Sequence, residues 1–192
     1  MNDFRKVSRF VCCEGDAIGG SIVIKLEPMV WDDLQRIIEW NKSSSSEFLL
    51  QWSGEFESPL TKEQLERHFS YGVNENGSDK YIYKIVYTPN DQVVGTIALK
   101  LNRKNKSGKI GKFLIGEESM RGKGIGQLAL EKLIYICFQE FSLHRISLGV
   151  YDFNSSAISC YEKVGFVKEG RDARKVGEKY WNLIEMSILN KQ

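Results

Sequence analysis

Residues 113–127 read Phe-Leu-Ile-Gly-Glu-Glu-Ser-Met-Arg-Gly-Lys-Gly-Ile-Gly-Gln, and residues 128–141 continue as an apolar stretch with helical spacing. This pattern predicts a short apolar strand, a turn with glycines at positions 122, 124 and 126, and a long amphipathic helix. The first N–H groups of such a helix have no partner within the helix, and its dipole places positive charge there. We therefore expect an anion site at the turn, where glycines let the backbone approach a phosphate group.

Two common phosphate-binding loops do not match this spacing. In the Walker loop four residues separate the first glycine from Gly-Lys-Ser/Thr, but Gly116 lies one residue too far from Gly122. A glycine also follows Lys123, where that loop needs a hydroxyl residue to bind magnesium. The dinucleotide loop Gly-x-Gly-x-x-Gly fails because Gly126 comes one position early. The turn is therefore another kind of phosphate loop or a glycine-rich turn without a ligand.

Length and composition indicate one domain with a substantial core. A chain of 192 residues is long enough for such a domain and short for two. Its hydrophobic content of 42% and charged content of 27% are typical of soluble globular proteins. The sequence contains no run of about 18 apolar residues, so we expect no membrane span. Residues 1–6 are not followed by a signal-peptide pattern. The net charge of +2 gives no reason to expect a nucleic-acid partner.

The four cysteines show no spacing typical of a metal or redox site. Cys12 and Cys13 are adjacent, which makes them a poor disulfide pair. Cys137 lies on the apolar face of the long helix, and Cys160 stands alone. We therefore expect no metal site and a reduced, cytoplasmic setting.

Hydrophobic periodicity and turn residues predict the other elements. We expect a strand at 21–28, helices at 30–41 and 61–71, three consecutive strands at 80–88, 92–101 and 109–115, a strand at 145–151, a helix at 154–164 and a closing hairpin at 166–175 and 179–189. Thr61 and Gln64 form the pattern of a capping box, whereas the form of residues 47–54 stays open. The consecutive strands favour an antiparallel sheet, and the strand–helix–strand unit across the glycine turn implies a parallel pair.

Two motifs resemble those of the GNAT acetyltransferase superfamily. Arg121-x-x-Gly124-x-Gly126 resembles the pyrophosphate loop of that family. Residues 154–166, Asn-Ser-Ser-Ala-Ile-Ser-Cys-Tyr-Glu-Lys-Val-Gly-Phe, resemble its second motif. The predicted order of elements is also similar, and the chain looks most like the branch that includes ribosomal-protein N-terminal acetyltransferases.

The resemblance implies a single GNAT domain at 21–189, after an N-terminal lead at 1–20 to which the sequence assigns no role. The fold class would be α/β (an α+β mixed sheet), with about seven mostly antiparallel strands and about four helices. A central parallel pair would be splayed apart to hold acetyl-CoA.

The activity that the resemblance implies is direct transfer of an acetyl group from acetyl-CoA to a primary amine, on a small molecule or at a protein N-terminus. The implied coenzyme-binding residues are Phe113, Leu114, Ile115, Arg121, Gly122, Lys123, Gly124, Ile125, Gly126, Gln127 and Asn154. The first three would bond the pantetheine arm through their backbone, and residues 121–127 would hold the pyrophosphate. Asn154 would contact the arm, although it is also a helix cap by its position.

Tyr161 is the residue that we expect to act in catalysis. The leaving group is a thiolate, whose conjugate acid titrates near about pH 8.5 by analogy with cysteine. A phenol beside the sulfur can donate a proton to it. The alternative is a tyrosine that only packs, on the same helix side as Ala157 and Ile158.

The general base stays open at this point. Many relatives have a glutamate just ahead of an Ile-Gly pair on the strand before the glycine turn, but this chain has Lys109-Ile110-Gly111 there. Glu117, Glu118 and Asp152 lie near the ends of the two central strands. A chain of water molecules to solvent is a further route for the proton.

The acceptor pocket is expected from residues 47–58 and from the closing hairpin. Aromatic side chains suit the stem of an amine, and acidic side chains would attract its cationic form. The aromatic candidates are Trp52, Phe56, Tyr180 and Trp181, and the acidic ones are Glu55 and Glu57.

Two other functions are weighed against this one. A non-catalytic acyl-CoA sensor on the same fold would explain the missing strand glutamate, but Tyr161 argues against it. A nucleic-acid-binding protein would use the basic turn at 100–112, but the net charge argues against it. Two other interpretations of that turn stay open: it steers the phosphate groups of the coenzyme, or it is a solvated hairpin. The oligomeric state, including a homodimer, stays open.

Overall fold

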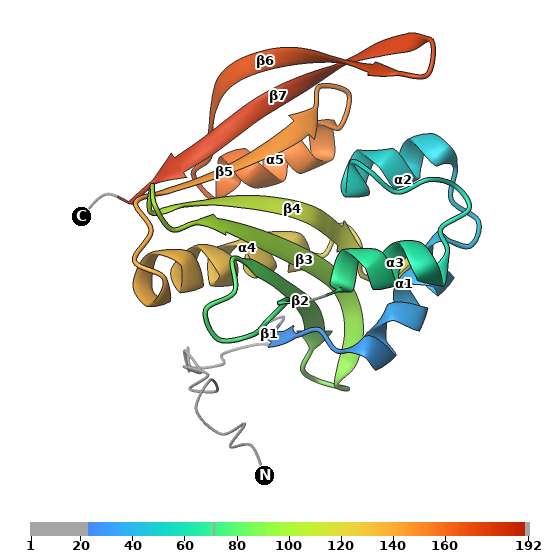
Figure 1. Cartoon of the computed structure of the whole chain (residues 1–192), viewed down its shortest axis with the longest axis horizontal. Helices are drawn as coiled ribbons and strands as arrows, with labels where there is room; N and C mark the ends of the chain where they lie inside the picture. The colour runs from blue at the N-terminus through green and yellow to red at the C-terminus, as the bar shows by residue number, and fades with distance from the viewer. Residues whose placement is uncertain (1–22, 71, 191–192) are drawn as a thin grey trace.

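The structure is a computed structural model that describes residues 23–70 and 72–190 (Figure 1). Its strands are β1 (Ile24–Pro28), β2 (Lys80–Tyr87), β3 (Gln92–Asn102), β4 (Ser107–Ile115), β5 (Arg145–Tyr151), β6 (Val167–Val176) and β7 (Lys179–Leu189). Its helices are α1 (Leu34–Asn41), α2 (Ser46–Ser53), α3 (Lys62–Phe69), α4 (Ile125–Tyr135) and α5 (Ser155–Lys163). The lead at 1–20 lies outside the described residues.

The strands form one sheet in the order β1-β2-β3-β4-β5-β7-β6. The pair β4–β5 is parallel, and the other neighbouring pairs are antiparallel. The predicted fold class is therefore confirmed. The described residues contain one helix more than expected, because the stretch left open at 47–54 forms α2. This helix begins after Ser45, whose hydroxyl accepts a hydrogen bond from the N–H of Phe48 at 3.1 Å.

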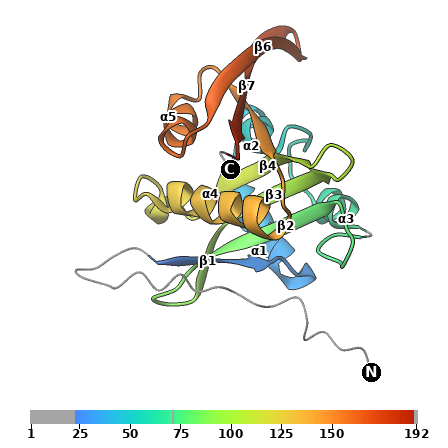
Figure 2. The ribbon, with the colours of Figure 1, turned by 90° about the vertical axis from the view of Figure 1, so that its left-hand side faces the viewer.

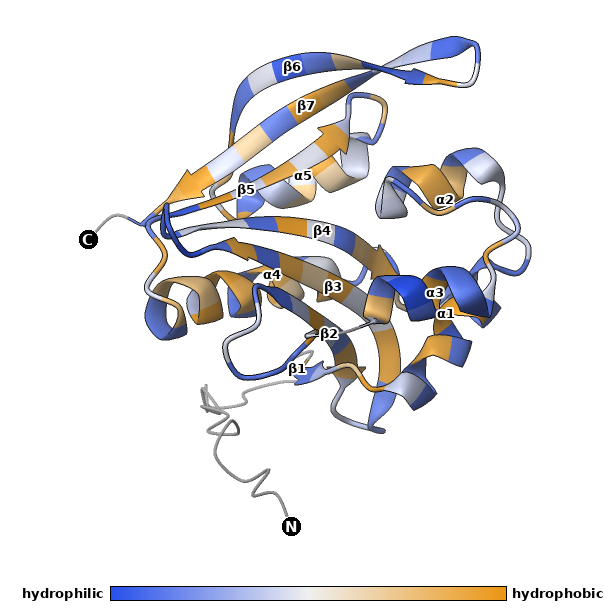
Figure 3. Cartoon of the chain, viewed as in Figure 1, coloured by the Kyte–Doolittle hydropathy of each residue, from blue (hydrophilic) through white to orange (hydrophobic). Residues whose placement is uncertain are grey.

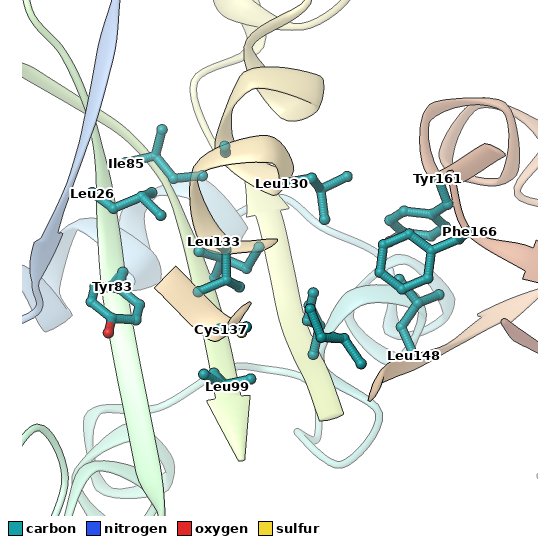
Figure 4. Packing of buried hydrophobic residues seen from close by; sticks show 14 of the residues in the cluster. Leu26, Tyr83, Ile85, Leu99, Leu130, Leu133, Cys137, Leu148, Tyr161 and Phe166 are labelled. Atoms are coloured by element: carbon teal, nitrogen blue, oxygen red, sulfur yellow. The ribbon is translucent and has the colours of Figure 1, made fainter. Parts of the chain in front are cut away.

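Helices cover both faces of the sheet (Figure 2). On one face, α4 and α5 pack on the larger hydrophobic core, where Leu133 and Phe166 are buried (Figure 4). On the other face, α1, α2 and α3 cover a second core that includes Leu49 and Ile82. Side chains alternate along a strand, so Ile82 and its neighbour Tyr83 enter different cores. Both faces of the central strands are thus buried, which fixes their register.

The closing hairpin has an exposed outer strand. β6 is exposed along its length except at Val176, and Figure 3 shows that most of its residues are hydrophilic. Charged side chains on an edge strand oppose pairing with another chain. β6 therefore forms a polar edge of the sheet, and the turn end of the hairpin extends past β5 (Figure 1).

β4 and β5 separate after a short paired segment. Their register contains only the positions from Ser107 to Lys109 on β4. β4 stays paired with β3 up to Ile115, but with a bulge at Lys112, whose φ of 46° is unusual for a residue with a side chain. β5 stays paired with β7 along its whole length. The edge of β4 beyond Lys109 therefore faces an opening and not a strand.

Three local predictions need correction. Thr61 caps α3 by accepting the N–H of Gln64 at 3.4 Å, but the side chain of Gln64 bonds the backbone of Glu57 and Pro59, so the capping box is incomplete. The carbonyls before the helix compete for that side chain. The helix ends at Phe69 and not at 71. The long helix predicted up to 141 changes at residue 136 into a π-helical turn.

Among the described residues, no helix is long and apolar enough to cross a membrane.

Candidate functional site

A cleft of about 740 Å³ opens where β4 and β5 separate. Its walls come from α2, β4, the glycine turn, the start of α4, β5 and α5, and it reaches Arg174 on β6 and Leu183 on β7. Figure 1 shows how β4 and β5 diverge, with α2 on one side of their open end and the β6–β7 hairpin on the other. The splayed sheet thus brings together segments that lie far apart in the sequence.

The glycine turn has the conformation that its sequence predicts. Gly122 and Gly124 have φ values of 72° and 80°, which favour glycine. Gly124 is the N-cap of α4 and offers no side-chain hydrogen bond. The next three N–H groups, of residues 125–127, therefore lack a capping side chain at a helix end that attracts anions. A Cβ on Gly126 would meet Phe113 at an ordinary 3.5 Å, so packing does not require a glycine there.

Nearly all the predicted coenzyme-binding residues line this cleft. They are Phe113, Leu114, Ile115, Arg121, Gly122, Gly124, Ile125, Gly126, Gln127 and Asn154. Lys123 is exposed on the turn and does not belong to the lining. Asn154 also caps α5, because its side-chain oxygen accepts the N–H of Ala157 at 3.2 Å. The cleft thus brings both predicted motifs to one place.

Arg121 holds the turn together in addition to lining the cleft. Its guanidinium donates hydrogen bonds to the carbonyl oxygens of Ile115 at 2.8 Å and Gly116 at 3.4 Å. The same group lies 5.5 Å from the centre of the Phe48 ring, on α2. Gly116 is covered by Trp40, whose ring would lie 2.0 Å from an added Cβ. Arg121 therefore connects the end of β4 to α2, a role that its charge alone did not predict.

Tyr161 lies in the cleft wall on α5 and is 8% exposed. Its ring packs beside Phe166 (Figure 4), at a centroid distance of 6.1 Å. On its other side the ring of Phe113 lies at a centroid distance of 6.4 Å. Burial raises the pKa of the Tyr161 hydroxyl well above its usual value, and the nearby Cys160 raises it further. The phenol is therefore protonated at neutral pH and can donate a hydrogen bond.

The carboxylates considered as bases do not line the cleft. Glu117 accepts a hydrogen bond from Gln92 at 3.3 Å, and Asp152 accepts one from Asn182 at 2.9 Å. The side chain of Glu118 is 85% exposed. Among the described residues no aspartate or glutamate lines the cleft.

Of the four aromatic acceptor candidates, only Trp52 lines the cleft. Phe56 is buried in the second core, and Tyr180 is 70% exposed. Trp181 packs edge-on against Tyr151 at a centroid distance of 4.9 Å. Phe56, Tyr180 and Trp181, which were expected to line the acceptor pocket, therefore do not line the cleft.

Sequence reasoning missed several lining residues. Phe48, Gln51 and Trp52 share one face of α2 and line the cleft together. Their spacing would have shown this face if the stretch had been recognised as a helix. Tyr151 and Arg174 carried no signal, since they enter the cleft only through the geometry of the splayed sheet and the hairpin.

Glu55 is engaged by basic groups of the protein. Its carboxylate lies 2.8 Å from Lys112 Nζ and 3.3 Å from His68 Nδ1. Burial raises the pKa of Glu55, but the hydrogen bond and charge of Lys112 outweigh it and hold that pKa below its usual value. Burial lowers the pKa of His68 to about 3, and the charges of Lys112 and Lys80 lower it too. Glu55 thus balances Lys112 at the edge of the cleft.

A family model agrees with this geometry. The model of the acetyltransferase (GNAT) family matches residues 34–166, a span that includes the glycine turn and most of the cleft. The chain is similar to two Bacillus subtilis proteins, the probable N-acetyltransferase YjcK (31% identity over 109 residues, 56% of this chain and 59% of that protein) and the prophage-derived uncharacterized N-acetyltransferase YokL (33% identity over 94 residues, 48% and 51%). The matches to these two span about half to three-fifths of their length.

Spermidine acetyltransferases from Vibrio cholerae give a longer sequence match and a match to a solved structure. Spermidine N(1)-acetyltransferase from Vibrio cholerae is 24% identical over 153 residues, which cover 78% of this chain and 84% of that protein. The crystal structure of spermidine N-acetyltransferase from Vibrio cholerae in complex with CoA and spermine has a TM-score of 0.73 at 21% identity. It covers 86% of this chain and 95% of that one. At this identity the likeness shows the fold.

Proposed function

The chain belongs to the GNAT acetyltransferase family, and we propose that it transfers the acetyl group of acetyl-CoA directly to a primary amine. One observation carries this proposal, the cleft that runs from the splayed β4–β5 pair to the uncapped N-terminus of α4. A free strand edge suits an extended amide-bearing arm, and a helix N-terminus suits a pyrophosphate.

The coenzyme is assigned to the lining residues of both motifs. The backbone of Phe113, Leu114 and Ile115 bonds the pantetheine arm as an added strand would. The turn residues 121–127, with Lys123 at their outer side, hold the pyrophosphate through N–H groups and positive charge. Asn154 contacts the arm while it caps α5.

Tyr161 serves as the acid in this proposal. The amine nitrogen attacks the thioester carbonyl carbon, a C–N bond forms, and the C–S bond breaks. The departing sulfur takes the proton of the Tyr161 hydroxyl. Tyr161 then regains a proton from solvent. Burial keeps this phenol protonated at neutral pH, so its hydroxyl is present as a donor to the departing sulfur, while the same raised pKa makes it a weaker acid than a free phenol. The proton of the amine leaves through water, since no carboxylate of the described residues lines the cleft.

The acceptor is a primary amine on a small molecule or at a protein N-terminus, the second in line with the resemblance to the ribosomal-protein branch. We further propose a cytoplasmic protein that acts without nucleic acid or membrane and forms a monomer or a homodimer. A single GNAT domain at 21–189 carries the activity.

The test is release of free coenzyme A thiol from acetyl-CoA in the presence of a panel of amines and N-terminal peptides. The full chain should release thiol and yield an acetylated amine of matching mass with at least one acceptor. Binding of acetyl-CoA without release on any acceptor would support a coenzyme sensor and overturn the transferase. Absence of acetyl-CoA binding in a titration would overturn the assignment of the cleft itself.

A further inference from the structure

One carboxylate on β7 lies beside the cleft without belonging to its lining. Glu185 is exposed, and its direct neighbour on β5 is Gly149, which lines the cleft. Two residues before Glu185 on β7, Leu183 lines the cleft as well. The side chain of Glu185 therefore starts one strand away from the opening, beside a position that has no side chain of its own.

Glu185 points to the face of the sheet opposite α4 and α5, which we call the outer face. Its two neighbours on β7 are buried in the larger core, and side chains alternate along a strand. The same alternation places Gly149 and Gly111 on the outer face, because the residues before them are buried in that core. The helices α1, α2 and α3 lie on this side of the sheet (Figure 2), and α2 lines the cleft.

Glycines flank Glu185 at its level of the sheet. Its direct partners are Gly149 on β5 and Gly170 on β6. The parallel register of β4 and β5, continued by two residues beyond Lys109, brings Gly111 to the level of Gly149. A Cβ on Gly111 or Gly170 would meet nothing within 4 Å, and neither residue has a positive φ. Neither packing nor backbone conformation requires these two glycines, and Glu185 carries the one side chain of the four positions.

No basic group of the described residues neutralises Glu185. Its carboxylate makes no ion pair or side-chain hydrogen bond within residues 23–70 and 72–190. None of the residues around it on the outer face is basic, and they are Ser147, Tyr151, Asp172, Leu183 and Ser187.

Two cations of the cleft lining share the outer face but lie farther away. Lys109 is on β4 with β5 between it and β7, so two strand spacings put its backbone at least about 10 Å from that of Glu185. Arg174 is four residues along β6 from Gly170, which is about 13 Å at 3.3 Å per residue. Exposed charges at such distances are largely screened at physiological ionic strength. The charge next to Gly149 is therefore negative.

We propose that Glu185 determines acceptor specificity by binding the ammonium form of the primary amine, so that acceptors without an anionic group near the amine are favoured. The inference rests on the proposed transferase function and names the residue that selects its substrate. The acceptor chain lies on the glycines between β4 and Glu185, whose carboxylate attracts a cation and repels an anion. The ammonium group then gives its proton to water, and the neutral nitrogen attacks the thioester. Glu55, which the sequence suggested for this attraction, is held by Lys112 at 2.8 Å.

The test compares acceptors that differ in one anionic group. The small pair is β-alaninamide and β-alanine, and the peptide pair is Ala-Gln-Ala amide and Ala-Glu-Ala amide. We expect kcat/KM to be about fivefold higher for the member without the carboxylate in at least one pair, as an exposed ion pair of about 1 kcal/mol gives. Salt should reduce the difference, because it screens exposed charges. Equal values in both pairs, or a preference for the acid in either, would overturn the proposal.

A charge-removing variant assigns the preference to Glu185. Glu185→Gln should raise the KM of the favoured acceptor about fivefold, abolish the preference, and leave kcat and the affinity for acetyl-CoA nearly unchanged. The control Glu178→Gln removes a carboxylate from the turn of the same hairpin, outside the cleft lining, and should keep the preference. Thermal unfolding of both variants is the control for the fold. A preference that survives in Glu185→Gln would overturn the assignment.

Two alanine variants test the place of the acceptor chain. Gly111→Ala adds a methyl group between β4 and Glu185 and should raise the KM of the acceptor about fivefold, because overpacking by one methyl group costs about 1 kcal/mol. Gly170→Ala adds the same group on the other side of Glu185, away from the cleft, and should leave the KM unchanged. Equal KM values for the two variants would contradict this placement.

Failure of the transferase function can be told apart from failure of this inference. If no acceptor is acetylated, the same pairs are titrated into the protein loaded with coenzyme A. Tighter binding of the member without the carboxylate, lost in Glu185→Gln, would support the cation-binding role in the absence of transfer. Equal binding of both members would contradict it.

Discussion

The two halves of the cleft are built in different ways. The half proposed for the coenzyme (the coenzyme half) consists mainly of consecutive residues, from the β4 edge through the glycine turn to the first turn of α4, with Asn154 of α5 added. The half proposed for the acceptor (the acceptor half) is assembled from α2, the bulge at Lys112, the end of β5 and the distant hairpin residue Arg174. A local segment thus forms most of one half, and the tertiary fold forms the other.

This difference explains why one half suits a fixed ligand and the other a variable one. Backbone N–H groups and a free strand edge place few demands on side chains beyond the glycines. The acceptor half depends on side chains such as Phe48, Trp52 and Arg174, which can change without altering the sheet. Substitutions in the two halves should therefore separate coenzyme binding from acceptor turnover.

The largest effect is expected for Gly124→Asp in the coenzyme half. A carboxylate at the N-cap of α4 would face the pyrophosphate, and repulsion of about 4 kcal/mol would weaken acetyl-CoA binding about 10³-fold. Isothermal titration measures this loss. The control Gly124→Asn has nearly the same shape without the charge and tolerates a positive φ, so it should bind much more tightly than the aspartate. Equal affinities for the two variants would show that no anion binds there.

Tyr161→Phe should lower the transfer rate about 10²-fold with little change in acetyl-CoA affinity. The reason is that the variant removes the proton donor but keeps the ring between Phe113 and Phe166. Thiol release gives the rate, titration gives the affinity, and thermal unfolding serves as the control for packing. A rate equal to that of the wild type would leave Tyr161 as a packing residue.

Acid should lower the free energy of unfolding through His68, which lies beside Glu55 at the edge of the cleft. The folded protein keeps this side chain neutral down to a pKa of about 3, whereas the unfolded chain binds the proton near its usual value of 6.5. Its contribution is therefore complete above pH 6.5 and is lost as the pH falls toward 3, by about 2 kcal/mol between pH 7 and pH 5.

Urea unfolding of the wild type, His68→Phe and His144→Phe at both pH values tests this contribution. His68→Phe should lose about this much of the pH dependence, while His144→Phe, which changes an exposed histidine, should behave as the wild type does. The same pH dependence in all three proteins would refute the role of His68.

The smallest effects come from two helix caps on opposite sides of the cleft. Ser45 caps α2 and Asn154 caps α5, each through one hydrogen bond. Ser45→Ala and Asn154→Ala should each lower the free energy of unfolding by about 1 kcal/mol. Only Asn154→Ala should also weaken acetyl-CoA binding, about fivefold, because one further hydrogen bond is worth about 1 kcal/mol. A matching loss of affinity in Ser45→Ala would mean that the halves are not independent.

The sequence predicts the coenzyme half well for a physical reason. The positive φ angles of Gly122 and Gly124 and the apolar face of α4 are local properties that residue types reveal. The antiparallel strands β2 to β4 and the parallel pair β4–β5 were predicted from the same local patterns, whereas the place of β7 between β5 and β6 was not, and the fold class is confirmed by the structure. The family assignment is confirmed by the family model.

The acceptor half was predicted less well because its positions depend on distant packing. Nothing in the local sequence shows that Phe56 enters the second core or that Trp181 packs on Tyr151. The pairing of Glu55 with Lys112 depends on a bulge that has no glycine to mark it, since Lys112 itself takes the positive φ. The roles of the coenzyme-binding residues and of Tyr161 stay predictions.

Amide hydrogen exchange of the full chain, with and without acetyl-CoA, tests the central claim most directly. The account predicts slower exchange at residues 113–115 and 122–127 when the coenzyme is present, and unchanged exchange at 45–53 and 176–182. Unchanged exchange at the glycine turn under saturating coenzyme, or protection confined to α2 and the hairpin, would contradict it.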